Sequence, residues 1–173
     1  MDGCSFFTHL LALRQFRESV LLQSIPTMQT RNFLLFLLGF LGIGAILGGG
    51  LLIISPSGSL LCAPLSILEP TSFNNFLIPG ILLFSVIGIA PLLLIIALTK
   101  RPKSKLAESF NCFKDMHWSW SYAIYMSFTL IIWIHVQEIL LKGVHWLHSF
   151  YILWALLILF VTQLPRVKRV YKL

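Results

Sequence analysis

The chain has 173 residues, of which 57% are hydrophobic and 11% charged, with a net charge of +7 and a mean hydropathy of +0.87. A soluble domain carries about 25% charged residues, so this composition excludes a globular surface in water and predicts an all-α bundle within a membrane. Nucleic-acid binding is not expected, because the basic residues flank apolar segments, where they anchor helices to anionic headgroups.

Residues 1–27 form an extension before the first strongly apolar segment. Five apolar residues in it lie at helical spacing, with charged residues on the other faces: Phe6, Leu10, Leu13, Phe16 and Val20. This pattern predicts an amphipathic helix that lies on the membrane surface and ends near Pro26. Alternatively, translation starts at Met28, and residues 1–27 are not part of the native protein.

The first predicted span covers residues 33–54, a stretch without a charge that is long enough to cross about 30 Å of hydrocarbon. Six glycines crowd its second half, and Gly44 and Gly48 have the GxxxG spacing that lets another helix approach closely. That helix belongs to the same chain, to a second copy in a homo-oligomer, or to a partner membrane protein.

Three further spans complete the predicted four-span domain at residues 28–165. They cover residues 76–98, 118–141 and 144–164, and a basic tail follows at residues 166–173. Pro79 and Pro91 predict a bend near each end of the second span, because proline removes a helical hydrogen bond. The connection before that span holds a short apolar segment bounded by prolines, which we expect at the membrane interface.

The distribution of Lys and Arg predicts the orientation. Twelve of the thirteen lie before the first span, between the second and third spans, or in the tail. The positive-inside rule therefore predicts an up-down bundle in the plasma (inner) membrane, with both termini cytoplasmic. Cys112 is then inside and Cys62 outside. Four residues of the middle loop are predicted to bind lipid headgroups: Lys100, Arg101, Lys103 and Lys105.

The outer ends of the spans hold the densest group of polar residues. A ligand site is predicted at His135, Gln137, Glu138 and Glu69, with His135 facing the bundle. His135 and Glu138 are three residues apart, as are His145 and His148, so each pair shares a helix face. If the pairs converge, their nitrogens and carboxylate suit zinc or another divalent ion.

No catalytic motif or nucleophile–base pair is recognisable, and no catalytic residue is predicted. The leading hypothesis is a non-enzymatic membrane protein, either a structural or accessory subunit or a binder of a lipid or small ligand. The alternatives are a small transporter or channel component, and a membrane-embedded metal protein or enzyme that uses the outer His and Glu residues. Apart from that metal, no cofactor is expected.

Three segments occur in a characteristic order: SPSG at residues 55–58, PLSILE at 64–69 and FLIPG at 76–80, followed later by WIHVQE at 133–138. In this the chain resembles small four-span bacterial membrane proteins, over roughly residues 28–165. The resemblance implies a four-span unit in a bacterial inner membrane, and it implies no activity.

Overall fold

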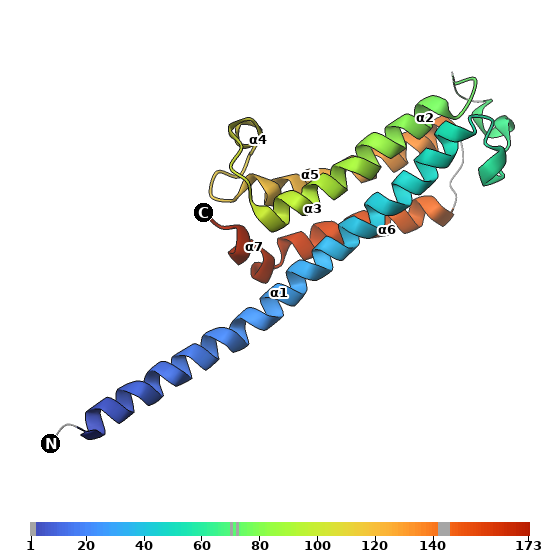
Figure 1. Ribbon diagram of the computed structural model, residues 1–173. Helices are drawn as coiled ribbons and strands as arrows, with labels where there is room; N and C mark the ends of the chain where they lie inside the picture. The colour runs from blue at the N-terminus through green and yellow to red at the C-terminus, as the bar shows by residue number, and fades with distance from the viewer. Residues whose placement is uncertain (1–2, 70, 72, 142–145) are drawn as a thin grey trace.

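The computed structural model of the chain (Figure 1) describes residues 3–69, 71, 73–141 and 146–173, with side chains from residue 28 onward except at 67, 140 and 141. Helices make up most of it, and the described residues form no strand. The helices that build the bundle are α1 (Gly3–Ile54), α2 (Leu77–Leu82), the π-helix η3 (Leu83–Ile89), α3 (Ala90–Lys100), α5 (Trp118–Leu141) and α6 (Trp146–Gln163).

Four helical segments are long and apolar enough to cross a membrane: Met28–Ile54, Leu77–Lys100, Trp118–Ile139 and Trp146–Gln163. These segments confirm the predicted all-α, four-helix class. Large apolar side chains such as Phe36, Ile132 and Phe160 are exposed on the outside of the bundle. A hydrocarbon solvent accommodates such a surface, and water does not.

The core lies where one face of α1 packs against the second span and α6, and where α5 packs against α6 and α3. On α1, Leu34, Leu37, Leu38 and Leu41 are almost completely buried. Their spacing of three and four residues marks a single helix face. The buried face of α5 also carries small hydroxyl side chains, among them Ser127, whose hydroxyl donates to the Ala123 carbonyl at 3.1 Å. Polarity alone therefore does not distinguish the inside of this bundle from its outside.

The predicted helix end near Pro26 is wrong, because α1 is continuous from Gly3 to Ile54. Proline lacks one backbone donor but has a helical φ of about −65°, so it weakens one turn without requiring the helix to stop. Beyond the bundle, the N-terminal part of α1 continues in line with the span and projects past the other helices (Figure 1).

Glycines hold α1 directly against the second span. A Cβ atom at Gly42 would lie 3.0 Å from the Gly88 carbonyl oxygen, and one at Gly49 would lie 2.7 Å from the Phe84 backbone nitrogen. The Gly49 distance is shorter than real Cβ contacts, and the Gly42 distance is tighter than nine in ten of them, so glycine at these positions favours the close approach. Packing of the glycine-rich span against a helix of the same chain is thereby confirmed for these two positions.

The second span contains a π-helix between its two prolines. The Ala90 backbone N–H donates to the Ser85 carbonyl, five residues earlier, at the end of η3. Pro91 follows directly and has no N–H to give to the preceding turn, which favours this wider pattern. The departure from regular helix therefore lies between the positions where bends were predicted, and it places Leu83 and Ile87 toward the centre of the bundle.

The end of the bundle that carries the C-terminus is tied together by hydrogen bonds. Two short helices lie there, α4 (Lys105–Ser109) and α7 (Pro165–Tyr171). The residues predicted as a basic tail form α7, whose Tyr171 is buried and donates its hydroxyl to the Leu98 carbonyl at 3.0 Å. Nearby, the Trp120 indole donates to the Thr162 carbonyl at 2.8 Å, which joins α5 to α6.

The connection from residue 55 to residue 76 lies at the opposite end of the bundle (Figure 1). It contains two short 3₁₀ helices, η1 (Ser59–Leu61) and η2 (Leu65–Leu68). Leu68 and Phe76 are buried, whereas Leu60 and Leu65 are exposed. One side of this apolar connection therefore packs against the helices, and the other side is left for the membrane interface.

Candidate functional site between the four spans

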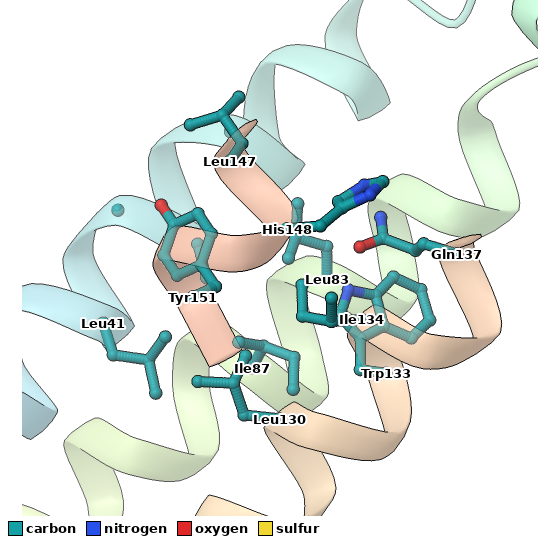
Figure 2. A pocket seen from close by; sticks show the side chains of 13 residues that line it. Leu41, Leu83, Ile87, Leu130, Trp133, Ile134, Gln137, Leu147, His148 and Tyr151 are labelled. Atoms are coloured by element: carbon teal, nitrogen blue, oxygen red, sulfur yellow. The ribbon is translucent and has the colours of Figure 1, made fainter. Parts of the chain in front are cut away.

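A cavity of about 210 Å³ lies at the point where all four spans meet (Figure 2). α1, η3, α5 and α6 each contribute to its wall, and most of the lining is apolar. The lining residues are Leu41, Gly44, Ala45, Gly48, Leu83, Ile87, Leu130, Trp133, Ile134, Gln137, Leu147, His148 and Tyr151.

Helical spacing explains which residues of α5 reach the cavity. Leu130, Trp133, Ile134 and Gln137 recur every three or four residues, so they share one face. His135 is one residue from Ile134, about 100° around a helix of 3.6 residues per turn, and its side chain is 70% exposed. The prediction that His135 faces the bundle is therefore wrong. Gln137 and the buried His148 occupy the inward position instead.

Glu138 joins the two histidines that the sequence singled out. One carboxylate oxygen lies 3.3 Å from His135 Nδ1, and the other lies 3.9 Å from His148 Nδ1. The side chain of Glu138 is 17% exposed, so the carboxylate is partly shielded between an exposed histidine and a buried one. His145, the fourth member of the predicted cluster, lies outside the described residues.

Within the described part of the chain, no three His, Cys, Asp or Glu side chains are grouped so that they could hold a metal ion. The divalent-metal hypothesis included His145, so it stays a prediction. Glu69 is exposed in the connection between the first two spans and does not line the cavity. Of the predicted ligand residues His135, Gln137, Glu138 and Glu69, the cavity wall contains only Gln137.

Sequence reasoning missed Trp133 and Tyr151, which supply polar atoms to the cavity. The spacing that could have found them is present, since Trp133 is four residues before Gln137 and Tyr151 is three residues after His148. His148 had been paired with His145, at the same spacing in the opposite direction. Figure 2 shows Tyr151 extending from α6 toward α1, and the Gln137 amide and His148 imidazole at one end of the cavity.

The indole nitrogen of Trp133 is buried and makes no hydrogen bond within the part of the chain that the structure describes. Indole can only donate, and a buried donor without an acceptor costs about 1–3 kcal/mol. The two other tryptophans inside the bundle are bonded: Trp154 donates to the Leu37 carbonyl at 3.1 Å, and Trp120 donates to Thr162. Trp133 thus leaves a free donor at the cavity wall.

The cavity reaches the outside of the bundle between α1 and α6. Gly44 and Leu147, which both line it, are exposed. A Cβ atom at Gly44 would meet only the Tyr151 hydroxyl oxygen, at 3.8 Å, and one at Gly48 would meet only Leu83, at 3.7 Å. Both glycines therefore have room that Gly42 and Gly49 lack. The hypothesis of a homo-oligomer or partner through Gly44 and Gly48 stays a prediction.

Three of the four predicted headgroup-binding residues gather at the other end of the bundle. Arg101, Lys103 and Lys105 line a second hollow, of about 330 Å³, which Lys100 does not line. His117 also lines it, and burial lowers the pKa of His117 below its usual 6.5, with Arg101 adding to the effect and Glu108 opposing it. This hollow is separate from the cavity between the spans.

Comparisons with protein-family models, curated proteins and solved structures gave no match. Function is therefore inferred from the chain's own residues.

Proposed function

We propose that this chain is a non-enzymatic, multi-pass membrane protein that binds a small lipid-derived ligand in the cavity between its four spans. The observation that carries the proposal is the free indole donor of Trp133 at the wall of a mostly apolar cavity. A ligand with an apolar body and a hydrogen-bond acceptor would fill the space and bond the donor.

The size of the cavity limits what can enter. An apolar cavity of about 150 Å³ holds benzene, and drug-sized ligands occupy about 300 Å³ or more. A volume of about 210 Å³ therefore suits a ring or a length of acyl chain rather than a large substrate. Gln137, His148 and Tyr151 add polar atoms that would orient one end of such a molecule.

The route of entry also favours a lipid-derived ligand. The exposed lining residues Gly44 and Leu147 open the cavity sideways, between two apolar helices, rather than only along the bundle axis. In a bilayer, hydrocarbon surrounds this opening, so a molecule already dissolved in the membrane would enter without first crossing water.

The proposed setting is an inner membrane, with the spans in up-down order and both termini in the cytoplasm. The excess of Lys and Arg on one side supports this orientation. The cavity would then lie in the outer half of the membrane, since Gln137 and His148 are at the end opposite the basic connection around Arg101.

Photolabelling with a diazirine-bearing palmitic acid tests the binding proposal. The full chain is labelled in lipid nanodiscs, and the labelled peptides are located by mass spectrometry. We expect label on α5 and α6 near Trp133 and Tyr151, and displacement by unlabelled palmitic acid.

A matched pair of double variants gives the control. Gly44→Ala with Gly48→Ala places two methyl groups at the cavity, and Gly39→Ala with Gly50→Ala places two on the same helix outside it. All four positions have room for a Cβ atom, at 3.6 Å or more from its nearest contact. The first pair should reduce labelling and the second should not. Equal labelling in both would contradict binding in this cavity.

A small ion-coupled transporter component is a second candidate. It is favoured by Glu138, whose two oxygens contact the exposed His135 and the cavity-lining His148. Such a chain of titratable groups could pass a proton between the surface and the cavity. In vesicles loaded with a pH-sensitive dye, this candidate requires proton uptake that Glu138→Gln abolishes, whereas a simple binder shows none.

A further inference from the structure

Several elements border the hollow at the basic end of the bundle. Arg101 lies just after α3, Lys103 lies in the connection that follows, Lys105 begins α4, and Trp118 begins α5. Its wall contains three exposed cationic side chains and one acidic side chain, that of Glu108, together with Leu173. The hollow has a volume of about 330 Å³ and is open to the outside on one side, where a ligand can enter.

The backbone around the hollow is held in place. Arg101 adopts a left-handed conformation with φ of 48°, and its N–H donates to the Ala97 carbonyl at 2.9 Å. Its guanidinium lies 5.0 Å from the centre of the Tyr171 ring, a cation–π contact. The Trp118 indole donates to the Pro102 carbonyl at 2.9 Å, which fixes the basic segment to the start of α5.

His117 adds a hydrogen-bond donor to the wall. The Ser119 backbone N–H donates to His117 Nδ1 at 3.3 Å, so in the neutral ring Nδ1 is the acceptor and Nε2 carries the proton. Nε2 is buried and makes no hydrogen bond of good geometry to any described residue, although the Arg101 and Pro102 backbones interact with the ring and partly oppose the effect of burial on its pKa. A free N–H beside three cations is a donor set suited to an anion with several acceptor oxygens.

We propose that this hollow binds a phosphate group, through Lys103, Lys105, Arg101 and the Nε2–H of His117, with Trp118 beside it. A phosphate monoester offers three acceptor oxygens and two charges, which matches the three cationic side chains that residues 101–105 place around one hollow. The group is the headgroup of an anionic lipid such as phosphatidic acid, or a soluble phosphate ester. Trp118 lies where interfacial tryptophans meet lipid headgroups.

This site does not depend on the ligand proposed between the spans. Gln137 in that cavity is twenty residues along α5 from His117, about 30 Å at 1.5 Å per residue. Loss of one binding activity therefore leaves the other to be measured separately.

Native mass spectrometry of the full chain in detergent micelles tests the site. The protein is titrated with phosphatidic acid, with phosphatidylcholine as the zwitterionic reference. We expect tighter binding of phosphatidic acid, and a loss of roughly tenfold or more in Lys103→Gln with Lys105→Gln, because a lysine near an anionic headgroup contributes about a factor of five.

The control variant removes the same charge from the same end of the bundle. Lys100→Gln with Lys172→Gln changes two exposed lysines that do not line the hollow. We expect a loss of less than about twofold in this variant. Equal losses in the two double variants, or equal binding of the two lipids by the unaltered protein, would overturn the proposal.

Two further measurements complete the test. Competition with glycerol 3-phosphate identifies the source of the phosphate: displacement of the lipid assigns the site to phosphate esters in general, and retention assigns it to the lipid. In the unaltered protein, the His117 imidazole resonances should shift on addition of phosphatidic acid. An unchanged His117 signal with lipid bound would show that the lipid binds elsewhere.

Discussion

Gly49 and Gly80 bring the first and second spans into direct backbone contact. A Cβ atom on Gly49 would lie 2.8 Å from the Gly80 carbonyl oxygen, and one on Gly80 would lie 3.2 Å from the Gly49 carbonyl oxygen. Each glycine therefore makes room for the other helix. Close approach of this kind is a main source of attraction between helices in a membrane, where apolar side chains gain little by leaving lipid.

Gly49→Ala should destabilise the bundle by about 1–3 kcal/mol, because the new methyl group meets backbone atoms that cannot move aside easily. Its neighbour provides the control. A Cβ atom on Gly50 would lie 3.9 Å from the Phe84 ring, an ordinary contact, so Gly50→Ala should be neutral or stabilising by up to about 1 kcal/mol. Reversible unfolding in mixed micelles with increasing dodecyl sulfate measures both. Similar values for the two variants would contradict the contact.

Trp133→Phe should affect the stability of the ligand-free protein less than Trp154→Phe does. Trp133→Phe removes a buried donor that has no partner among the described residues, so we expect little loss of stability, or a small gain. Trp154→Phe removes the bond to the Leu37 carbonyl and should cost about 0.5–1.5 kcal/mol or more. The same unfolding assay compares them. In the presence of palmitic acid, Trp133→Phe should lose part of the stabilisation that the ligand gives the unaltered protein.

Cysteine labelling tests the orientation. Cys62 and Cys112 are both exposed thiols, and the proposed topology puts them on opposite sides of the membrane. In single-cysteine variants with the other cysteines changed to serine, a charged maleimide added to intact cells should label Cys62. Cys112 should react only after the membrane is permeabilised. Labelling of Cys112 in intact cells would reverse the orientation.

His117 should make stability depend on pH. Because burial lowers its pKa, the unfolded chain takes up a proton at a higher pH than the folded chain does. Stability is therefore complete above the unfolded value of 6.5 and falls as the pH drops through 6.5 toward the folded pKa. His117→Asn, which keeps an acceptor for Ser119, should reduce this fall. The difference should stay below about 1 kcal/mol, because the ring is only partly buried and solvent screens the effect. Unfolding midpoints from about pH 7.5 to 5.5 measure it.

The sequence predicted the number and position of the spans, because each is an apolar run about as long as a bilayer is thick. It did not predict which way His135 faces. In a soluble helix, polarity marks the outside, but α5 buries Ser119 and Ser127 and exposes Ile132. The rule used for His135 assumed that polar side chains in a membrane turn inward. This histidine near the helix end meets Glu138 on the outside instead.

The sequence also did not allow us to predict that α1 continues through Pro26, or that the second span contains a π-helix. Proline favours a break or a bend, yet the outcome depends on whether neighbouring turns can rearrange their hydrogen bonds. In η3 they do so by widening, with the Ala90 N–H reaching the Ser85 carbonyl. The cavity depends on this wider hydrogen-bond pattern, because Leu83 and Ile87 of η3 line it. Its existence could therefore not be read from the apolar pattern.

The hydrogen bonds of α7 have a consequence for how the protein is made. Tyr171 bonds to Leu98 at the end of α3, and the Leu173 N–H bonds to the Asp115 carbonyl just before α5, at 3.0 Å. Ribosomes synthesise α7 after every span, so this end of the bundle stays open until α7 has left the ribosome. All four spans are therefore made before these hydrogen bonds can form, and a chain that ends before Pro165 would lack them.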